Sequence, residues 1–587
     1  MNSEKRFLST KRVFVIIAAF ICMLSVAMGS ISAQACTAVY VGNEVSDDGT
    51  TLIAKSNDFS NVWGNYVTIT ERVEGQEGRT MPVDNAGTVQ AEIPSLTYRY
   101  TSTPWMDSTV AYNGLGKDAA ICENECGVVM LMSITAFSNA KALKADPLVK
   151  NGITEFTAVD LVVCQSSTAR EGVETLLGLI DRYGSSETNI AFIADQHETW
   201  YIEMYTGHQY AAVKLPDDRV CAFGNEFLLE YASDYEDSIL SSNLESLAKD
   251  NEFAVYDGDK FNLLESYSGE EVATNYSHMR TWMTHKLLAP SKVEDYNKDE
   301  KYPLCFKPDK EVSLTDVMAI MRNRFEKTEY SPDKTNRTDM RVIGTETATS
   351  VHIAQIYPNL PDNMSCVTWE SSGPALYGVF VPVSNGATSI SEPYGKNQKA
   401  EDKQVFDESY PYYRFKALTT LASEPDRYKI YGKPVRAYWK EAEKGMTAGM
   451  GEVLQRAADM DDNEDACQYI TDYCNSMQNQ AFNDAGVLLN DVKWYLSKNS
   501  NTMKNGRNPE THEVLDELKK VKPLQVTLDP SVYQAVPEVP VHSAQEEIKE
   551  KANSNVVVYI VLGAAAVIII LGAVYIIFRM RKRSENG

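Results

Sequence analysis

The sequence lacks the motifs that identify several large classes of enzyme. It contains no HExxH zinc motif, no glycine-rich phosphate-binding loop and no glycine-rich dinucleotide turn. It has no C-x-x-C pair, which excludes zinc ribbons and thioredoxin-like redox sites. Its 7 histidines are scattered along the chain without the spacing of metal ligands. We therefore expect neither a metal ion nor an organic cofactor.

Basic residues are also scarce. The chain of 587 residues has 56 Lys and Arg against 81 Asp and Glu, which gives a formal net charge of -25. A surface with this excess of negative charge repels the phosphates of nucleic acids. We therefore expect no nucleic acid partner, and we interpret the acidic residues as a well-solvated exterior.

Long apolar runs occur only near the two ends of the chain. At the N-terminal end, residues 13–29 are apolar, follow a basic segment and precede Ala33-Gln34-Ala35, a cleavage site of small residues. This order predicts that residues 1–35 are a signal peptide that is cleaved after Ala35. The alternative is an anchor that is not cleaved.

At the C-terminal end, residues 556–578 are apolar and long enough to span a bilayer. Basic residues follow within 579–587, which places that tail in the cytoplasm. Residues 520–555 are rich in Pro, Val, Glu and Lys and have the composition of a stalk. We expect a single-pass protein of the cell membrane with its catalytic domain outside the cell.

The part between these runs predicts an α+β fold. Short β-branched segments follow Cys36, recur as a meander over 189–223 and return over 350–383. Residues 154–183 have the period of two amphipathic helices. Thr168 and Glu171 predict a capping box between them, and Gly184 closes the second helix. The chain is helical again from about 408 to 500. Strands in two layers with helix pairs between them favour a sandwich.

Cys36 stands directly behind the predicted cleavage site. Cleavage after Ala35 would give this residue a free α-amine, with a pKa of about 8, beside a thiol with a pKa of about 8.5. The amine can accept the thiol proton, so that one residue supplies both nucleophile and base. The alternatives are a buried structural cysteine and the lipidated cysteine of a lipoprotein, whose pattern Ala33 and Gln34 fit poorly.

Several segments together resemble a known family. They are "CTAVYVG" with "KSND", "ENECGVVM", "STAREGVETLLGLIDRYG", "AFIADQHETWYIEM", "CAFGNEF" and a later strand region from "VHIAQIY", in this order from Cys36 to about residue 500. This ordered set is similar to the dipeptidase-A-like cysteine peptidases, to which the secernins are related. These belong to the N-terminal-nucleophile hydrolases, with choloylglycine hydrolases and penicillin V acylases as more distant relatives.

The resemblance implies a fold and a domain organisation. It implies a four-layer αββα sandwich of the N-terminal-nucleophile hydrolases over 36–407. Residues 408–519 would be a helical C-terminal part of the catalytic region. One C-terminal transmembrane helix, 556–578, would follow the stalk.

The resemblance also implies catalytic roles. Cys36 would be the nucleophile, Asp58 would hold its α-amine, and Lys55 would favour the thiolate. Asn225 would stabilise the oxyanion. The alternatives to these roles are an ordinary turn carboxylate, a solvated lysine and a turn asparagine.

Two further residues would bind substrate. Asn124, in the Asn-Glu-x-Gly segment, and Arg280, in "NYSHMRTW", match the family loosely. A plain turn suits Asn124 and a surface position suits Arg280 equally well. A papain-type Cys–His pair would need His352, which we interpret as a core or edge histidine.

The predicted activity is the hydrolysis of small peptides, most simply dipeptides, through a thioester on Cys36. The first alternative is an amidase of the same fold that acts on bile-salt-like or penicillin-like amides. The second is a non-catalytic surface binding protein whose Cys36 is lipidated or structural.

Overall fold

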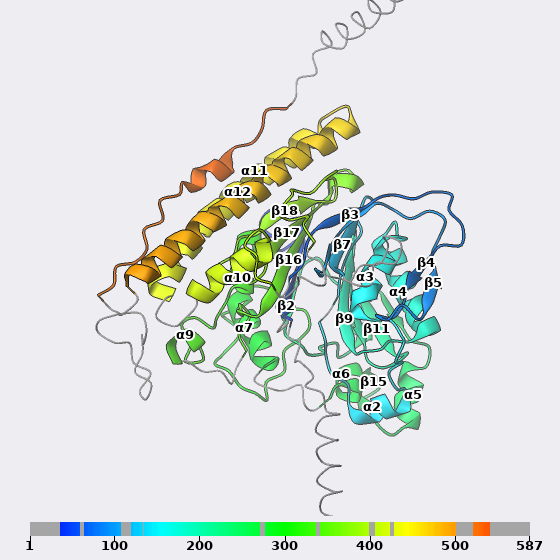
Figure 1. Cartoon of the computed structure of the whole chain (residues 1–587). Helices are drawn as coiled ribbons and strands as arrows, with labels where there is room; N and C mark the ends of the chain where they lie inside the picture. Colours follow the sequence, from blue (N-terminus) through cyan, green and yellow to red (C-terminus); the bar gives the residue numbers. More distant parts are fainter. Residues whose placement is uncertain are drawn as a thin grey trace, which may run out of the picture. The chain divides into compact units, whose positions relative to one another are not determined.

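Two antiparallel sheets carry the fold (Figure 1). The computed structural model describes residues 36–58, 64–106, 119–132, 134–269, 276–335, 341–397, 405–422, 428–499 and 520–539. The predicted α+β class is confirmed.

The first sheet has six strands and contains the segment that follows Cys36. Its strands, in spatial order, are β12 (Val220–Phe223), β1 (Ala38–Val41), β2 (Thr51–Asp58), β16 (Ala348–Ile356), β17 (Cys366–Ser372) and β18 (Val381–Ser384). The turn between β1 and β2 includes Gly49 at φ 74°, a left-handed conformation that glycine adopts without steric cost. In the β1–β2 register, Ala38 lies opposite Lys55.

The second sheet has eight strands. In spatial order they are β13 (Ser238–Leu240), β11 (Tyr210–Lys214), β10 (Thr199–Met204), β9 (Asn189–Ala194), β8 (Val129–Leu131), β7 (Ala119–Asn124), β6 (Tyr100–Pro104) and β3 (Thr68–Thr70). Two small hairpins pair β4 (Thr80–Pro82) with β5 (Gln90–Glu92), and β14 (Val255–Asp257) with β15 (Lys260–Asn262).

The main core lies between the sheets, and the second sheet is also buried on its other face. Phe192 and Ala194 of β9 pack with Ala38 and Tyr40 of β1 in one hydrophobic cluster. Ile193, the residue between the first two, belongs to a separate cluster. Side chains alternate along a strand, so a strand buried on both faces needs the unbroken apolar run that β9 has.

Helices cover the outer face of each sheet. On the second sheet, α3 (Glu155–Val163) and α4 (Ala169–Tyr183) supply much of the second cluster. Figure 1 shows α11 and α12 beside β18, on the side of the first sheet away from α3 and α4. The helices that contact the first sheet are α7 (His278–Leu288), α8 (Leu314–Met321), α10 (Pro411–Ala422), α11 (Lys433–Ala458) and α12 (Asn463–Lys498). Shorter helices are α2 (Ala140–Ala145), α5 (Leu244–Asp250), α6 (Leu263–Tyr267) and α9 (Pro332–Thr335).

The predicted ends of α4 are confirmed, with one difference. The Thr168 side chain accepts a hydrogen bond from the backbone N–H of Glu171 at 3.1 Å, and Gly184 ends the helix at φ 72°. The Glu171 carboxylate, however, accepts hydrogen bonds from the N–H and hydroxyl of Ser167 instead of closing a reciprocal bond to Thr168. The helix start is therefore stabilised over two residues.

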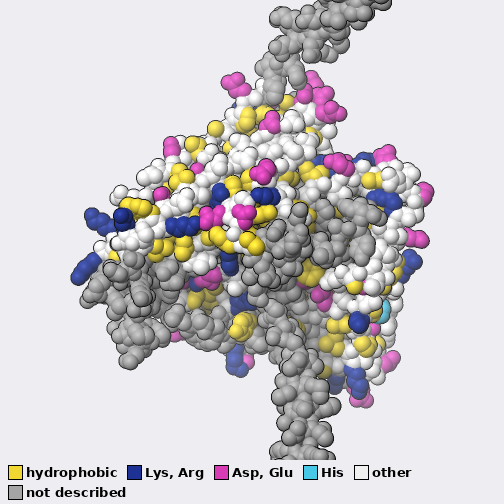
Figure 2. Space-filling view, in the orientation of Figure 1, with side chains coloured by type: hydrophobic (Ala, Val, Ile, Leu, Met, Phe, Trp, Pro, Cys, Tyr) yellow, Lys and Arg dark blue, Asp and Glu magenta, His cyan; other side chains and the backbone are white. Residues whose placement is uncertain are grey.

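Charged side chains are mixed over the surface. Figure 2 shows acidic and basic groups interspersed on the visible face, with acidic groups gathered at its upper and right-hand edges. This distribution suits a solvated exterior.

The first residues of the predicted stalk pack against helices. Residues 520–536 belong to the same compact unit as the sheets. The short helix η6 (Pro530–Gln534) lies along α11, and Tyr533 is fully buried (Figure 1). A Pro-rich segment without periodicity can pack in this way because its contacts with neighbouring helices, rather than its own hydrophobic pattern, determine its conformation.

The predicted membrane topology is corrected. No helix within the described ranges is long and apolar enough to cross a membrane. The segments predicted as signal peptide (1–35) and membrane span (556–578) lie outside the described residues. This finding contradicts the localisation expected from the sequence, a single-pass protein of the cell membrane.

Candidate active site

Most of the predicted site residues meet at the start of β1. Cys36 lies two residues before the first residue of this strand, and Lys55 and Asp58 come from the neighbouring β2. Asn225 follows β12, the strand on the other side of β1, and Arg280 comes from α7, which packs on β12. Three segments, of which two are distant in sequence, therefore meet at one cysteine.

The Cys36 thiol is fully buried. Burial raises its pKa from 9.0 to about 11, while Lys55 and the backbone N–H of Asp58 act in the opposite direction. A thiol with this pKa stays protonated at neutral pH and is a weak nucleophile. Catalysis by Cys36 thus requires a base that removes the proton as the sulfur attacks.

Lys55 is buried at the interface between the two sheets. Its ammonium donates a hydrogen bond to the backbone carbonyl of Met132, just beyond β8 of the second sheet. Burial lowers the pKa of Lys55, and the negative charges of Cys36, Glu155 and Asp58 oppose that change. These neighbours show that Lys55 lies in the electrostatic environment of the thiol rather than in solvent.

Asp58 is a buried carboxylate with unused hydrogen-bonding capacity. Both of its side-chain oxygens are buried, and neither has a partner at hydrogen-bonding distance and angle within the described part of the chain, although the neighbouring Ser56 hydroxyl lowers the pKa of this carboxyl. Burial raises its pKa from 3.8 to about 6, with Arg341 and Arg280 opposing the rise. The Nε atom of Arg341 lies 3.9 Å from one oxygen. An α-ammonium group on Cys36 would provide the missing donor and a compensating charge.

Asp58→Asn is expected to stabilise a chain in which Ala35 still precedes Cys36. Because the folded pKa of Asp58, about 6, lies above the unfolded value near 3.9, the folded state binds more protons between these values. Stability contributed by Asp58 is therefore lost as the pH rises through this window, and the amide avoids the loss. Urea unfolding should show a gain of up to roughly 3 kcal/mol at pH 8 and a small one at pH 4. No gain at pH 8 would mean that Asp58 already has a partner.

The Arg280 side chain contacts both the backbone of Cys36 and the side chain of Asn225. Its fully buried guanidinium donates hydrogen bonds to the carbonyl of Cys36, to Thr37 Oγ1 at 3.1 Å and to Asn225 Oδ1 at 2.8 Å. Its Nε donates to the carbonyl of Tyr276 at 2.6 Å, and burial lowers its pKa to about 10. The sequence predicted that Arg280 binds substrate; in the structure its guanidinium is engaged with protein groups, and it is not at the surface.

The Asn225 side-chain amide makes hydrogen bonds through both its nitrogen and its oxygen. Its Nδ2 donates to the carbonyl of Thr135 at 2.7 Å and its Oδ1 accepts from Arg280. The second Nδ2 hydrogen has no protein acceptor among the described residues. The preceding Gly224 lies so close to α7 that a Cβ there would be 2.6 Å from the carbonyl oxygen of Ser277. Glycine therefore permits the close approach that brings Asn225 beside Arg280.

Asn124 is not part of this group. At the end of β7, its Nδ2 donates to the carbonyls of Val163 and Ser166 at 2.8 and 2.7 Å. Its Oδ1 accepts from the backbone N–H groups of Cys126 and Val128, each at 3.0 Å. All hydrogen-bonding positions of the amide are used by backbone groups of its own turn and of the C-terminal end of α3, so nothing remains for a substrate.

His352 also lies in the core, as the sequence interpretation expected. Its Nε2 is 2.9 Å from Ser350 Oγ, and its Nδ1 is 2.5 Å from Glu370 Oε2. All three side chains lie on β16 and β17 and are buried. His352 is thus engaged within the first sheet. Within the described ranges, no three His, Cys, Asp or Glu side chains form a group that could hold a metal ion.

Sequence reasoning missed three contributors to the site. Glu155 is a buried acid at the start of α3, and its charge acts on both Cys36 and Lys55. Its signal was an acidic residue at the start of a mostly apolar helix, a signal that Asp160 of the same helix shares. Arg341 acts on Asp58, and Thr135 holds Asn225, but both come from irregular segments whose sequences carry no such signal.

Comparison with known proteins identifies the family. The model of peptidase family C69 matches residues 35–441. A probable dipeptidase from Latilactobacillus sakei is 28% identical over 372 residues, which cover 62% of this chain and 77% of that protein. A probable dipeptidase B from Lactococcus lactis subsp. lactis is 31% identical over 358 residues, covering 59% and 73%.

Among solved structures, a variant of conjugated bile acid hydrolase from Clostridium perfringens is similar at 10% identity. The match covers 62% of this chain and 95% of that one, with a TM-score of 0.31, which is too low to support an argument. The family match, in contrast, spans most of the chain and includes the cluster around Cys36. The chain belongs to peptidase family C69, and the protein is therefore a cysteine peptidase.

Proposed function

We propose that the protein is a dipeptidase in which Cys36, freed at its N-terminus, is both nucleophile and base. The observation that carries the proposal is the buried Asp58 carboxylate, whose oxygens have no partner of full hydrogen-bond geometry among the described residues and which acts electrostatically on the Cys36 thiol. Removal of residues 1–35 would create an α-amine at this point. Dipeptides are the proposed substrates because the relatives are named probable dipeptidases.

The geometry suits a two-step acyl transfer. The α-amine of Cys36 takes the thiol proton while the sulfur attacks the carbonyl carbon of the substrate amide. Lys55 favours the negative charge on sulfur, and the free Nδ2 hydrogen of Asn225 is available for the oxyanion. Collapse of the tetrahedral intermediate breaks the C–N bond, and the α-ammonium returns its proton to the departing amine.

Hydrolysis of the thioester completes the cycle. The α-amine now takes a proton from water, whose oxygen attacks the thioester carbonyl, and the Cys36 thiol is released with the product acid. Asp58 holds the α-amine throughout, by a charge-assisted hydrogen bond when the amine is protonated. Arg280 keeps the Cys36 carbonyl and Asn225 in place.

A comparison of two N-termini tests the proposal. One chain begins at Cys36, released from a cleavable fusion, and the other begins at Ala35, so that the Cys36 nitrogen is an amide. We expect the first to hydrolyse dipeptides and the second to lose about 10²-fold or more in kcat, because the general base is lost. Equal activity would show that the amine is not the base. Hydrolysis of acyl conjugates of glycine or taurine, but not of dipeptides, would show a different amidase.

Asn225→Ala is expected to lower kcat by about 10²–10³-fold with a smaller change in KM, because an oxyanion donor acts mainly in the transition state. Asn124→Ala is the matched control, since its amide serves only the backbone. That variant should melt at a lower temperature and keep the kcat of its folded fraction. Steady-state kinetics and thermal melts of both variants measure this. An Asn225→Ala variant that lost only stability would contradict the oxyanion role.

A further inference from the structure

Two cysteines outside the active site lie in unusually close contact. Cys221, on β12, and Cys305, between α7 and α8, are 84 positions apart in sequence, and their sulfurs are 2.7 Å apart. Non-bonded heavy atoms pack at about 3.5–4.0 Å. The two side chains therefore point directly at one another, with no other group between them.

The backbone geometry places both cysteines where a disulfide fits. Val220 and Phe306 exchange two backbone hydrogen bonds, each 2.9 Å long, as an antiparallel bridge. The next pair along this bridge, Cys221 and Cys305, is consequently a non-hydrogen-bonded pair, whose Cα atoms are about 4.5 Å apart in antiparallel strands. Disulfides span Cα distances of about 4.4–6.8 Å, so the bond requires little backbone movement.

We propose that Cys221 and Cys305 form a disulfide that connects the segment around residue 305 to β12, the edge strand of the first sheet. The bond would close a long loop that contains α7 and therefore Arg280. It would also fix the strand that ends just before Gly224 and Asn225. This cross-link is independent of the hydrolytic chemistry at Cys36.

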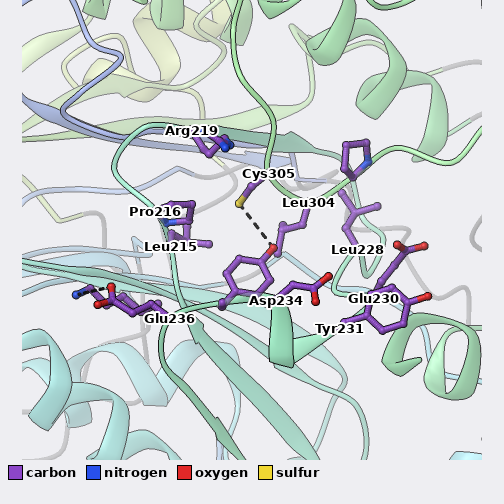
Figure 3. Close-up of a pocket in the computed structure, with 13 residues that line it drawn as sticks. Leu215, Pro216, Arg219, Leu228, Glu230, Tyr231, Asp234, Glu236, Leu304 and Cys305 are labelled. Carbon is purple, nitrogen blue, oxygen red and sulfur yellow. Dashed lines mark hydrogen bonds and ion pairs between the residues drawn. The ribbon is translucent and has the colours of Figure 1, made fainter. Parts of the chain in front are cut away.

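Oxidation would begin at the Cys305 thiol. Whereas Cys221 is fully buried, Cys305 is partly exposed and lines a cavity of about 400 Å³ with Leu304, Tyr231 and Asp234 among its other walls. Figure 3 shows the Cys305 sulfur directed toward the middle of this cavity, where the hydroxyl of Tyr235 donates to it at 3.8 Å. A small disulfide molecule can therefore reach Cys305 but not Cys221.

The reaction is a thiol–disulfide exchange with a small-molecule disulfide, RSSR, as oxidant. The Cys305 thiolate attacks one sulfur of RSSR, which breaks its S–S bond, releases RS⁻ and leaves a mixed disulfide on Cys305. Cys221, after losing its proton, attacks the Cys305 sulfur and expels the second RS⁻. Both leaving thiolates take up the protons, so two cysteine thiols and one RSSR give one protein disulfide and two RSH.

The test uses the full chain incubated with reduced or oxidised glutathione. Peptide mass mapping should show one cross-linked peptide pair, Cys221 with Cys305, after oxidation, and two alkylated thiols after reduction. Oxidation should raise the Tm by about 5 °C, because the bond closes a loop of 84 residues. The rise should be absent in Cys221→Ser and in Cys305→Ser, and should persist in Cys126→Ser, a half-buried cysteine elsewhere.

Two outcomes would overturn the proposal. The first is that both thiols remain open to alkylation in oxidised glutathione after brief partial unfolding in urea. The second is that Cys305 carries glutathione permanently while Cys221 stays reduced. Because both cysteine-to-serine variants retain Cys36, their dipeptide hydrolysis in the reduced state should equal that of the parent chain. This separates the cross-link from the proposed activity.

Discussion

Replacement of Cys36 by alanine is expected to abolish peptide hydrolysis and leave the fold intact. The variant keeps the α-amine and the backbone carbonyl that Arg280 binds, so only the attacking atom is lost. Loss of a covalent nucleophile lowers kcat by about 10⁴-fold or more. Cys36→Ser should retain a trace of activity at most, because an alkoxide is far harder to form than a thiolate. Amine release from a dipeptide measures the rate, and circular dichroism checks the fold.

The matched control is Cys126→Ala. Cys126 lies in the turn that Asn124 holds, away from the cluster around Cys36, and is half-buried. Its loss should leave kcat unchanged. Full activity in Cys36→Ala, or equal losses in both variants, would show that the nucleophile is not Cys36.

The strands and the importance of Cys36 could be predicted from the sequence because both depend on patterns of neighbouring residues. β1, β2 and β9 show the β-branched and apolar patterns that half-buried or fully buried strands require. The resemblance connected Lys55 and Asp58 with Cys36, and the pairing of β1 with β2 brings their segments together. Asn225 and Arg280 could be found only by resemblance, since their meeting depends on where α7 packs on β12.

The remaining features depend on tertiary contacts that no local pattern encodes. Whether Asn-Glu-x-Gly serves a turn or a substrate was undecided until the partners of Asn124 were known. The same holds for Arg280, whose burial and four hydrogen bonds to protein groups exclude the surface position that the sequence left open. Composition alone could not predict that residues 520–536 pack against helices, because a single buried side chain can hold a segment that has no periodicity.

That residue is Tyr533. Its side chain is fully buried, and its hydroxyl donates to Asp484 Oδ2 at 2.8 Å. Tyr438 of α11 donates to the same oxygen at 2.6 Å, and Asp484 belongs to α12. Nearer the start of the segment, the N–H of Leu524 donates to the carbonyl of Ile430 at 2.8 Å. Tyr533 therefore connects residues 520–536 to the buried carboxylate of Asp484, which also accepts a hydrogen bond from Tyr438 of α11.

A chain that ends at residue 519 is consequently expected to be much less stable than one that ends at residue 539. The shorter chain exposes the apolar surface under Tyr533 and removes one of the donors to Asp484, and loss of a buried aromatic side chain alone costs about 3–5 kcal/mol. Tyr533→Ala in the longer chain should reproduce most of this loss. Tyr533→Phe, which removes only the hydroxyl, should cost about 1.5–3 kcal/mol because the acceptor is charged.

Urea unfolding of the four chains measures these differences, and kcat at a temperature where all are folded provides the control. The proposed catalytic residues lie on or next to the first sheet and α7, so kcat should be the same in every chain. Two results for the shorter chain would contradict the role given to Tyr533. Equal stability of the chains ending at 519 and 539 would mean that residues 520–539 are a stalk, as their composition alone indicated. A loss in the shorter chain that Tyr533→Ala did not reproduce would place the stabilising contacts elsewhere in the segment, with the Leu524 backbone bond as the next site to test.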